Sequence, residues 1–324
     1  MIEEPKVDRS FVYLDRDFHF AVPVLDVVEV MVVDDVRPGH VKLDAYLGNV
    51  RHRGRLLPLL DSVALTRGPG STGSAAKPKA AVVMVKGGIQ FALTLERFLT
   101  VILLDSLPPR KRVEGHAAPV ATFEGCIESV RAHGNNALIQ FSADALARGV
   151  SDCFGDQRIL GGEETEAREI QAEQDFERFL CATLEKLMFA IPVDQVIEVI
   201  EDYEVTPFFC VDPILRGLIN LRGEVVACVD ISVSMGFRPR ALLEKDQYVV
   251  LEGEAGKLAV CVDQVHQVRL LPRARRQEPA GILAAELTHF LSSVIEYDGE
   301  SIFVLEVRRI FDSPLLAPYR KTEK

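Results

Sequence analysis

The stretch LRGLINLRGEVVACVD, residues 215–230, places an Arg-Gly pair between two apolar runs. Glycine adopts backbone angles that residues with a Cβ resist, so Gly223 is expected to let the chain turn sharply from one strand into the next. Arg222 would then stand at the outer end of the bend. Its guanidinium is either a contact for a partner, as exposed arginines are at many interfaces, or a structural group bonded to local carbonyls. The sequence leaves both interpretations open.

A second stretch of the same kind, AYLGNVRHRGRLLPLLD at residues 45–61, indicates an internal repeat. FAIPVDQVIEV begins at Phe189, 169 positions after FAVPVLDVVEV begins at Phe20, and the same offset relates Arg222 to Arg53. Later segments match at offsets of 167 and 164, so the length differences fall between the matching segments. This pattern predicts two copies of one fold.

Each copy consists mainly of short β-type runs. FVYLDRDFHFAVP, residues 11–23, predicts a β-hairpin that turns at Asp15, Arg16 and Asp17. Further strands are predicted for RLLPLLD, AAVVMV, FALTLE and NALIQFS and for their counterparts in the second copy. Many short strands without long helices between them favour barrels over a parallel α/β sheet.

The residues that follow each hairpin have a different spacing. Apolar side chains at positions i, i+3, i+4 and i+7 predict one short helical turn on the core, at Val24, Val27, Val28 and Met31 and again at Val193, Val196, Ile197 and Ile200. Pro23 and Pro192 suit the first position of such a turn. A proline that ends a strand is the alternative, and the sequence does not decide between the two.

Composition limits the class of protein. With 324 residues, 48% hydrophobic and 26% charged, the chain is predicted to form about two globular domains. A net charge of −11, no Trp and only 6 Tyr argue against nucleic-acid binding or a broad anionic-membrane surface. The charged N-terminus lacks a signal-peptide core, and no apolar run approaches the roughly 20 residues of a membrane span, so a cytoplasmic protein is expected.

No catalytic, cofactor-binding or metal-binding residues are predicted. The six cysteines form no C-x-x-C pair, which indicates reduced and mostly buried thiols rather than disulfides or a zinc site. The seven histidines show no H-E-x-x-H spacing, and the chain has no G-x-S-x-G elbow or P-loop. A catalytic site assembled from distant residues is the alternative that such motif searches leave open.

The segment between the copies is acidic. Glu163 to Glu177 contains seven acidic residues against the single basic Arg168. We interpret it as a hydrated linker, because runs of charge usually stay in water. An acidic docking segment is the alternative interpretation.

The pattern G-x-I-N-L-R-G-x-V-V-x-x-V-D, preceded by FAIPVDQVIEVI, resembles the CheW-like domain of chemotaxis coupling proteins. The resemblance covers residues 9–147 and 173–318, with residues 148–172 as the acidic linker. It implies a mainly β fold of two tandem CheW-like domains, each built from two SH3-like five-stranded β-barrels with short helices. The same family implies no enzymatic activity.

The resemblance also implies partners. CheW-like domains are adaptors that couple the cytoplasmic tips of methyl-accepting chemoreceptors to the regulatory domain of a CheA-type histidine kinase, so recruitment to membrane-associated arrays, without membrane insertion, is expected. A related adaptor in pilus motility, gliding or second-messenger signalling, which binds only receptor or only kinase, is the alternative.

The family's contact positions can be carried over to both copies. They are Val196, Glu198, Asn220, Leu221, Arg222 and Gly223 in the second copy and Val27, Glu29, Arg53 and Gly54 in the first. The first copy departs from the family by having Asn49-Val50-Arg51-His52 before Arg53, which predicts a different partner for it, or binding by the second copy alone. Arg222→Glu is expected to weaken binding at little cost in stability, unless the arginine is structural.

Overall fold

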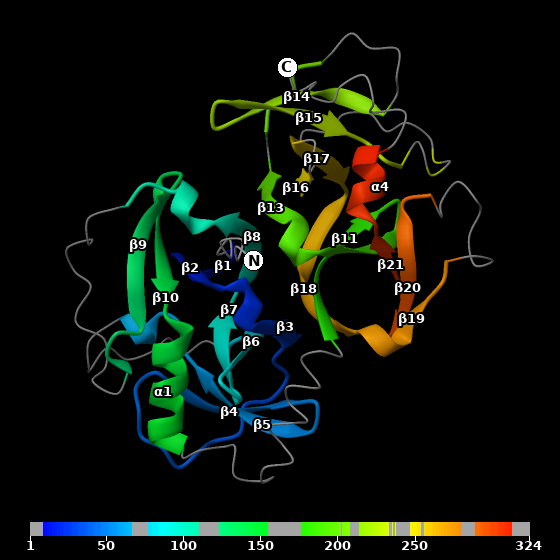
Figure 1. Cartoon of the computed structure of the whole chain (residues 1–324). Coiled ribbons are helices and arrows are strands. Elements are labelled where there is room, and N and C mark those ends of the chain that lie inside the picture. The colour runs from blue at the N-terminus through cyan, green and yellow to red at the C-terminus, as the bar shows by residue number, and fades with distance from the viewer. Residues whose placement is uncertain are drawn as a thin grey trace, which may run out of the picture. The chain divides into compact units, whose positions relative to one another are not determined.

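The computed structural model describes residues 9–66, 77–109, 123–154, 176–201, 203–207, 214–232, 235, 237, 247–253, 256–279 and 289–312. The chain divides into two compact units, unit 1 (Met1–Gln174) and unit 2 (Asp175–Lys324). Within each unit the described residues are mainly β-strands, and unit 2 repeats the strand series of unit 1 with the short strand β19 (Arg276–Gln277) in addition (Figure 1). The mainly β fold and the internal repeat predicted from the sequence are confirmed.

Unit 1 contains two sheets. The first sheet has the strand order β8-β1-β2-β10-β9, and the second has the order β3-β6-β7-β5-β4. The elements of unit 1 are β1 (Arg9–Asp15), β2 (Phe18–Pro23), the 3-10 helix η1 (Val24–Asp26), β3 (Val27–Val32), β4 (Tyr46–His52), β5 (Arg55–Leu60), η2 (Ala64–Thr66), β6 (Ala80–Lys86), β7 (Ile89–Leu95), β8 (Arg97–Leu103), η3 (Leu104–Ser106), β9 (Ile127–His133), β10 (Asn136–Phe141) and α1 (Ala143–Phe154).

Unit 2 repeats both sheets. The first has the order β18-β11-β12-β21-β20-β19, and the second has the order β13-β16-β17-β15-β14. The elements of unit 2 are β11 (Phe176–Leu184), β12 (Leu187–Pro192), η6 (Val193–Gln195), β13 (Val196–Glu201), β14 (Leu215–Leu221), β15 (Glu224–Val229), β16 (Gln247–Gly253), β17 (Gly256–Val262), β18 (Gln264–Pro272), η8 (Arg273–Arg275), β19 (Arg276–Gln277), β20 (Leu291–Tyr297), β21 (Glu300–Leu305) and α4 (Val307–Asp312).

The second sheet of each unit is nested inside the first along the chain. In unit 1 the strands β3 to β7 follow β2, and the chain then returns to the first sheet with β8, β9 and β10. Strand β10 pairs in parallel with β2, as β21 does with β12 in unit 2. The first and last strands of a unit therefore belong to one sheet, and Figure 1 shows β10 beside β2.

Isolated bridges link the two edges of the sheets. The chain after β3 returns to β4 through the bridge Arg37–Asn49, and the chain after β13 returns to β14 through Thr206–Leu218. In the first sheet of unit 1, Pro109 bridges to Arg131 of β9. These contacts join the outermost strands of a sheet as closure of a barrel requires. The SH3-like barrel assignment itself stays a prediction.

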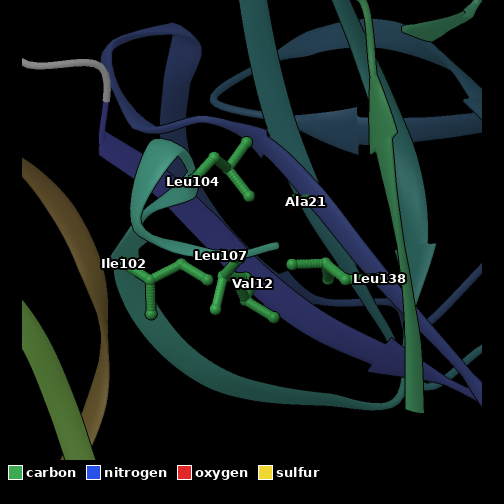
Figure 2. Packing of buried hydrophobic residues seen from close by; sticks show 6 residues of the cluster. All are labelled: Val12, Ala21, Ile102, Leu104, Leu107 and Leu138. Carbon is green, nitrogen blue, oxygen red and sulfur yellow. The ribbon is translucent and has the colours of Figure 1, made fainter. Parts of the chain in front are cut away.

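Each first sheet packs buried apolar side chains into a core. One cluster in unit 1, shown in Figure 2, consists of Val12, Ala21, Ile102, Leu104, Leu107 and Leu138. Its counterpart in unit 2 consists of Phe179, Ala190, Leu271, Ile295, Ile302 and Val304. Burial of such side chains contributes most of the stability of a small β domain, at about 1.5–3 kcal/mol for each large one.

Polar side chains join the two sheets of unit 1. Tyr13 Oη in β1 lies 3.0 Å from Ser62 Oγ, which follows β5, and Thr94 Oγ1 in β7 donates to Asp15 Oδ2 at 2.6 Å. Arg16, in the β1–β2 turn, donates to Asp61. All of these groups except Arg16 are buried, so the hydrogen bonds satisfy polar atoms that would otherwise destabilise the interface between the sheets.

The expected helical turn after the first hairpin needs correction. The β1–β2 hairpin is confirmed, but the helical turn after it is limited to the 3-10 helix η1, and Val27, Val28 and Met31 lie in strand β3. Pro23 is the last residue of β2, so the strand-ending alternative also holds. The apolar spacing arose from a strand interrupted by a bulge, which mimics a helical period.

The expected linker begins inside a helix. Residues 148–154 belong to α1, where Leu146 and Val150 are buried and Ser142 Oγ accepts the Ala145 N–H at 3.3 Å as an N-cap. Residues 155–175, with most of the acidic run, lie outside the described residues.

Candidate functional site

A tight turn presents each Arg-Gly pair. Strands β14 and β15 are joined by Arg222 and Gly223, whose φ angles are 53° and 89°, and β4 and β5 are joined by Arg53 and Gly54, at 46° and 83°. Positive φ at both central residues defines a type I′ turn, which matches the twist of the flanking strands. The bend predicted at Gly223 is confirmed. The left-handed arginine was not predicted and costs about 1–2 kcal/mol of strain.

The side chain of Asn220 stabilises the turn of unit 2. Its Oδ1 accepts the Gly223 N–H at 2.9 Å. Arg51 holds the corresponding place in unit 1, 169 positions earlier. Asn220 therefore has a structural role in forming the turn, besides the contact role that the family resemblance implies.

A β-bulge directs a glutamate side chain toward each turn. The pairing of β13 with β16 shifts register between Val196 and Glu198, and that of β3 with β6 shifts between Val27 and Glu29. A bulge places an extra residue in one strand and changes the direction of the side chains that follow. As a result, the glutamate reaches the arginine although 24 residues separate them in the chain.

In unit 2 the glutamate and the arginine form an ion pair. Arg222 Nη2 donates to Glu198 Oε2 at 2.8 Å. The Glu198 side chain is 6% exposed and that of Arg222 is 39% exposed, so the pair extends from the interior to the surface. Burial raises the pKa of Glu198, and the charges of Arg222 and Lys257 lower it by less, so the net shift is upward.

In unit 1 the glutamate has an additional partner. Arg53 Nη2 donates to Glu29 Oε2 at 2.9 Å, and His52 Nε2 lies 2.5 Å from Glu29 Oε1. Burial raises the pKa of Glu29, but the hydrogen bond with His52 and the charge and hydrogen bond of Arg53 outweigh burial, so the net shift is downward. His52 was not among the predicted site residues. Its position next to Arg53 was the available signal.

The remaining predicted site residues divide into buried and exposed groups. Val27 and Val196 are fully buried and Leu221 is 5% exposed, so these three support the site from the core and offer almost no surface to a partner. Asn220, Gly223 and Gly54 are exposed. The structure thus brings Glu198 and Arg222 together beside an exposed turn, and Glu29 and Arg53 likewise.

An exposed apolar residue lies next to each turn. Leu56 in β5 is 44% exposed and Val225 in β15 is 67% exposed. Across the hairpins, Leu56 pairs with Arg51 and Val225 pairs with Asn220. Apolar and charged groups side by side on an exposed hairpin are suited to recognising another protein. Sequence reasoning missed both, because each looked like a core residue of its apolar run.

The described residues show no feature of a metal site or of a membrane span. Across them, no three His, Cys, Asp or Glu side chains gather closely enough to hold a metal ion. No helix in that part of the chain is both long and apolar enough to cross a membrane. The described cysteines are free and mostly buried, as predicted, and burial raises the pKa of Cys126 and of Cys181 to about 12.

Two nested β-sheet units, each with a Glu–Arg ion pair beside an exposed turn, define a tandem-repeat β protein. The sequence profile of the CheW-like domain matches residues 12–146 and 178–315, which is most of the chain, so the chain belongs to the CheW-like domain family. Members of this family are chemotaxis scaffolds without catalytic activity.

Individual relatives match one copy of the repeat. The chain is 22% identical over 130 residues to the chemotaxis protein CheW of Treponema pallidum (strain Nichols), a match that covers 39% of this chain and 76% of the relative. The crystal structure of the scaffolding protein TtCheW from Thermoanaerobacter tengcongensis is 20% identical, with a TM-score of 0.39, and the match covers 43% of this chain and 94% of that one.

Proposed function

We propose that this protein is a non-catalytic adaptor that couples chemoreceptors to a CheA-type histidine kinase in a chemotaxis-like array. The observation that carries the proposal is the partly exposed Arg222 held by the buried Glu198 beside the β14–β15 turn. Family membership supplies the partner classes, and residues 9–147 and 173–318 are the two adaptor domains that we propose. We place the protein in the cytoplasm, recruited to receptor arrays.

The ion pair supports a binding role through pre-organisation. A free arginine side chain loses conformational entropy when a partner immobilises it, at about 0.5–1.5 kcal/mol. The bond to Glu198 limits the motion of Arg222 before any partner arrives. The Arg222 side chain is 39% exposed, so a partner can reach it, and arginines in such positions often dominate interface energies.

We propose that the contact surface of unit 2 is formed by Asn220, Arg222, Gly223 and the edge of Glu198, and that of unit 1 by Glu29, Arg53 and Gly54. Val27, Val196 and Leu221 act by holding these groups from below, because they are buried. The role of the tandem is avidity. A second contact by the same chain at millimolar effective concentration raises overall affinity by roughly 100- to 10,000-fold.

Calorimetric titration of the whole chain tests the function. The titrants are the regulatory domain of a CheA-type kinase from the same cell and, separately, a chemoreceptor tip. Saturable binding of both, weakened by Arg222→Glu or Arg53→Glu, is the expected result. Arg148→Glu, an exposed position on α1, is the control with the same change of charge.

Each outcome has a distinct meaning. If only one of the two titrants binds, the protein is an adaptor of a related motility or second-messenger pathway. If neither binds while the chain is folded, the coupling function is wrong. The stoichiometry shows whether one unit or both take part.

A further inference from the structure

The hairpin tip of unit 1 is strongly basic. Arg51, Arg53 and Arg55 lie within five consecutive residues, and all three are exposed. Arg53 is bonded to Glu29, whereas the described residues provide no ion pair for Arg51 or Arg55. We call this surface, with the exposed Leu56, the basic tip. It is a local excess of positive charge on a chain whose net charge is −11.

The corresponding surface of unit 2 lacks this excess of positive charge. The positions of Arg51 and Arg55 are taken by Asn220 and Glu224. Glu224 lies 2.5 Å from Lys257 Nζ, so the charge at this position is both reversed and paired. The turn geometry of the two units is nevertheless the same, with positive φ at both central residues. The units thus present one backbone shape with two different charge patterns.

An apolar side chain accompanies the charges of the basic tip. Leu56 pairs across the hairpin with Arg51, so the two side chains stand on one face of the ribbon. Arg55 pairs with His52 and stands on the other face, the one from which His52 reaches Glu29. A ligand that covers the tip therefore meets an arginine on each side and an apolar group beside one of them.

We infer that the basic tip of unit 1 is a docking surface for an acidic polypeptide segment of a partner protein, which the corresponding tip of unit 2 does not take. Unpaired guanidinium groups form bidentate hydrogen bonds with carboxylates, and Leu56 covers an apolar residue of the same segment. A nucleic acid fits less well, because three arginines and a leucine on one turn are a small electrostatic footprint on an acidic protein.

The inference refines the proposed function, on which it rests for the idea that the turn is a docking surface. It assigns different partner chemistry to the two units. Unit 1 prefers acidic segments by electrostatic complementarity, and unit 2 selects by the Glu198–Arg222 pair and Val225. Charge complementarity of this kind determines specificity and association rate more than it determines affinity.

Fluorescence anisotropy on the whole chain tests the inference. The probe is a labelled helical peptide with glutamate along one face and leucine beside it, and the control is the same peptide with glutamine for glutamate. We expect the glutamate peptide to bind, and to bind more weakly as salt is raised, because salt screens exposed charges. The glutamine peptide should bind at least about tenfold more weakly.

Variants that exchange the charge patterns of the two units localise the site. Arg51→Asn with Arg55→Glu gives unit 1 the residue types of unit 2 and leaves Glu29, His52 and Arg53 in place, so the fold is expected to persist. Binding of the glutamate peptide should fall about tenfold. The reciprocal Asn220→Arg with Glu224→Arg should add a second binding equivalent.

The inference is overturned if the first double variant, with unchanged thermal unfolding, binds the probe as well as the parent does, or if both peptides bind equally. It is also overturned if the parent binds only after Glu163, Glu164 and Glu166 are changed to Gln, because the chain's own acidic run would then occupy the tip. Titration with the kinase domain separates the two proposals. Kinase binding without probe binding overturns this inference alone, and probe binding without kinase or receptor binding overturns the coupling function alone.

Discussion

Leu221 of unit 2 takes the place that His52 takes in unit 1, immediately before the arginine of the turn. His52 Nε2 lies 2.5 Å from Glu29 Oε1, whereas a leucine offers Glu198 no hydrogen bond. The two glutamates are therefore shifted in opposite directions, Glu29 to a lower pKa and Glu198 to a higher one. One substitution between the repeats changes the electrostatics of the site.

The first prediction concerns pH. The pKa of Glu29 lies below its ordinary value of 4.5, so its carboxylate stabilises the fold at neutral pH, and this contribution is lost as the pH falls from about 4.5 through the lowered pKa. The stability advantage of the parent over Glu29→Gln should fade below pH 4.5. For Glu198 the raised pKa has the opposite effect. The protonated Glu198 side chain stabilises the fold below pH 4.5, its ordinary pKa. This contribution is lost as the pH rises through the raised pKa of Glu198.

Thermal unfolding of the whole chain between about pH 2.5 and pH 7 measures this difference, because the Glu29 contribution changes below pH 4.5 and that of Glu198 above it. Relative to the parent, Glu198→Gln should gain stability as the pH rises and Glu29→Gln should lose it. If the stability of both variants relative to the parent changed with pH in the same direction, the opposite pKa shifts of Glu29 and Glu198 would be wrong.

The second prediction isolates His52. Replacing His52 by leucine removes a hydrogen bond that favours the charged form of Glu29, so the pKa of Glu29 should rise. In that background, the pH slope of Glu29→Gln should become smaller or reverse. Leu221→His in unit 2 is the matched control, and it should lower the pKa of Glu198. An unchanged slope in the His52→Leu background would show that Arg53 alone determines the shift.

The third prediction concerns Arg222. The sequence alone suggested that Arg222→Glu would hardly change stability if the arginine were an interface residue. The structure shows that the Arg222 side chain is 39% exposed and is bonded to Glu198, whose side chain is only 6% exposed, so Arg222 has a structural partner, a carboxylate rather than local carbonyls. The interface role of Arg222 stays a prediction. A second carboxylate there would leave two like charges in contact. We expect a loss of about 1–3 kcal/mol in unfolding free energy.

A double-mutant cycle checks this. Glu198→Gln combined with Arg222→Gln leaves no charge in the site and should recover much of the stability lost on charge reversal. If Arg222→Glu unfolds at the temperature of the parent, the ion pair contributes nothing to stability, and Arg222 serves binding only.

The fourth prediction compares two glycines of the same hairpin. A Cβ at Gly223 would meet nothing within 4 Å. The loss of stability in Gly223→Ala should therefore come only from holding alanine at φ +89°, about 1 kcal/mol. A Cβ at Gly217 would lie 2.4 Å from Thr206 O, where the chain after β13 bridges to β14. Gly217→Ala should cost more than about 2 kcal/mol, because the backbone there cannot move away easily. Denaturant unfolding of both variants measures the difference, and equal losses would mean that the bridge is dispensable.

Much of the fold could be predicted because the chain contains it twice. The repeat offset, the β1–β2 hairpin and the Arg222-Gly223 bend all rest on local residue types, and the structure confirms them. The strand β3 was misread as helical, because the bulge between Val27 and Glu29 breaks the two-residue alternation by which a strand is recognised.

The site was predictable only in part. The family pattern gave the partners of the ion pair, but it could not show that Val27 and Val196 are buried or that His52 reaches Glu29. Those facts depend on strand register, which places residues 23 positions apart in contact. The exposure of Leu56 and Val225 likewise depends on which face of each hairpin its own sheet turns toward the core.

The nesting of one sheet inside the other determines the order in which a growing polypeptide can fold on the ribosome. Strands β3 to β7 are contiguous, so they can pair as soon as they are synthesised. The β1–β2 hairpin must wait for β8 and, longest, for β10, which is made more than 100 residues later and pairs with β2. Until then one edge of the hairpin is an unprotected template for other strands. The β11–β12 hairpin waits in the same way for β21, but β10 has by then been synthesised, so the growing chain holds one waiting hairpin at a time.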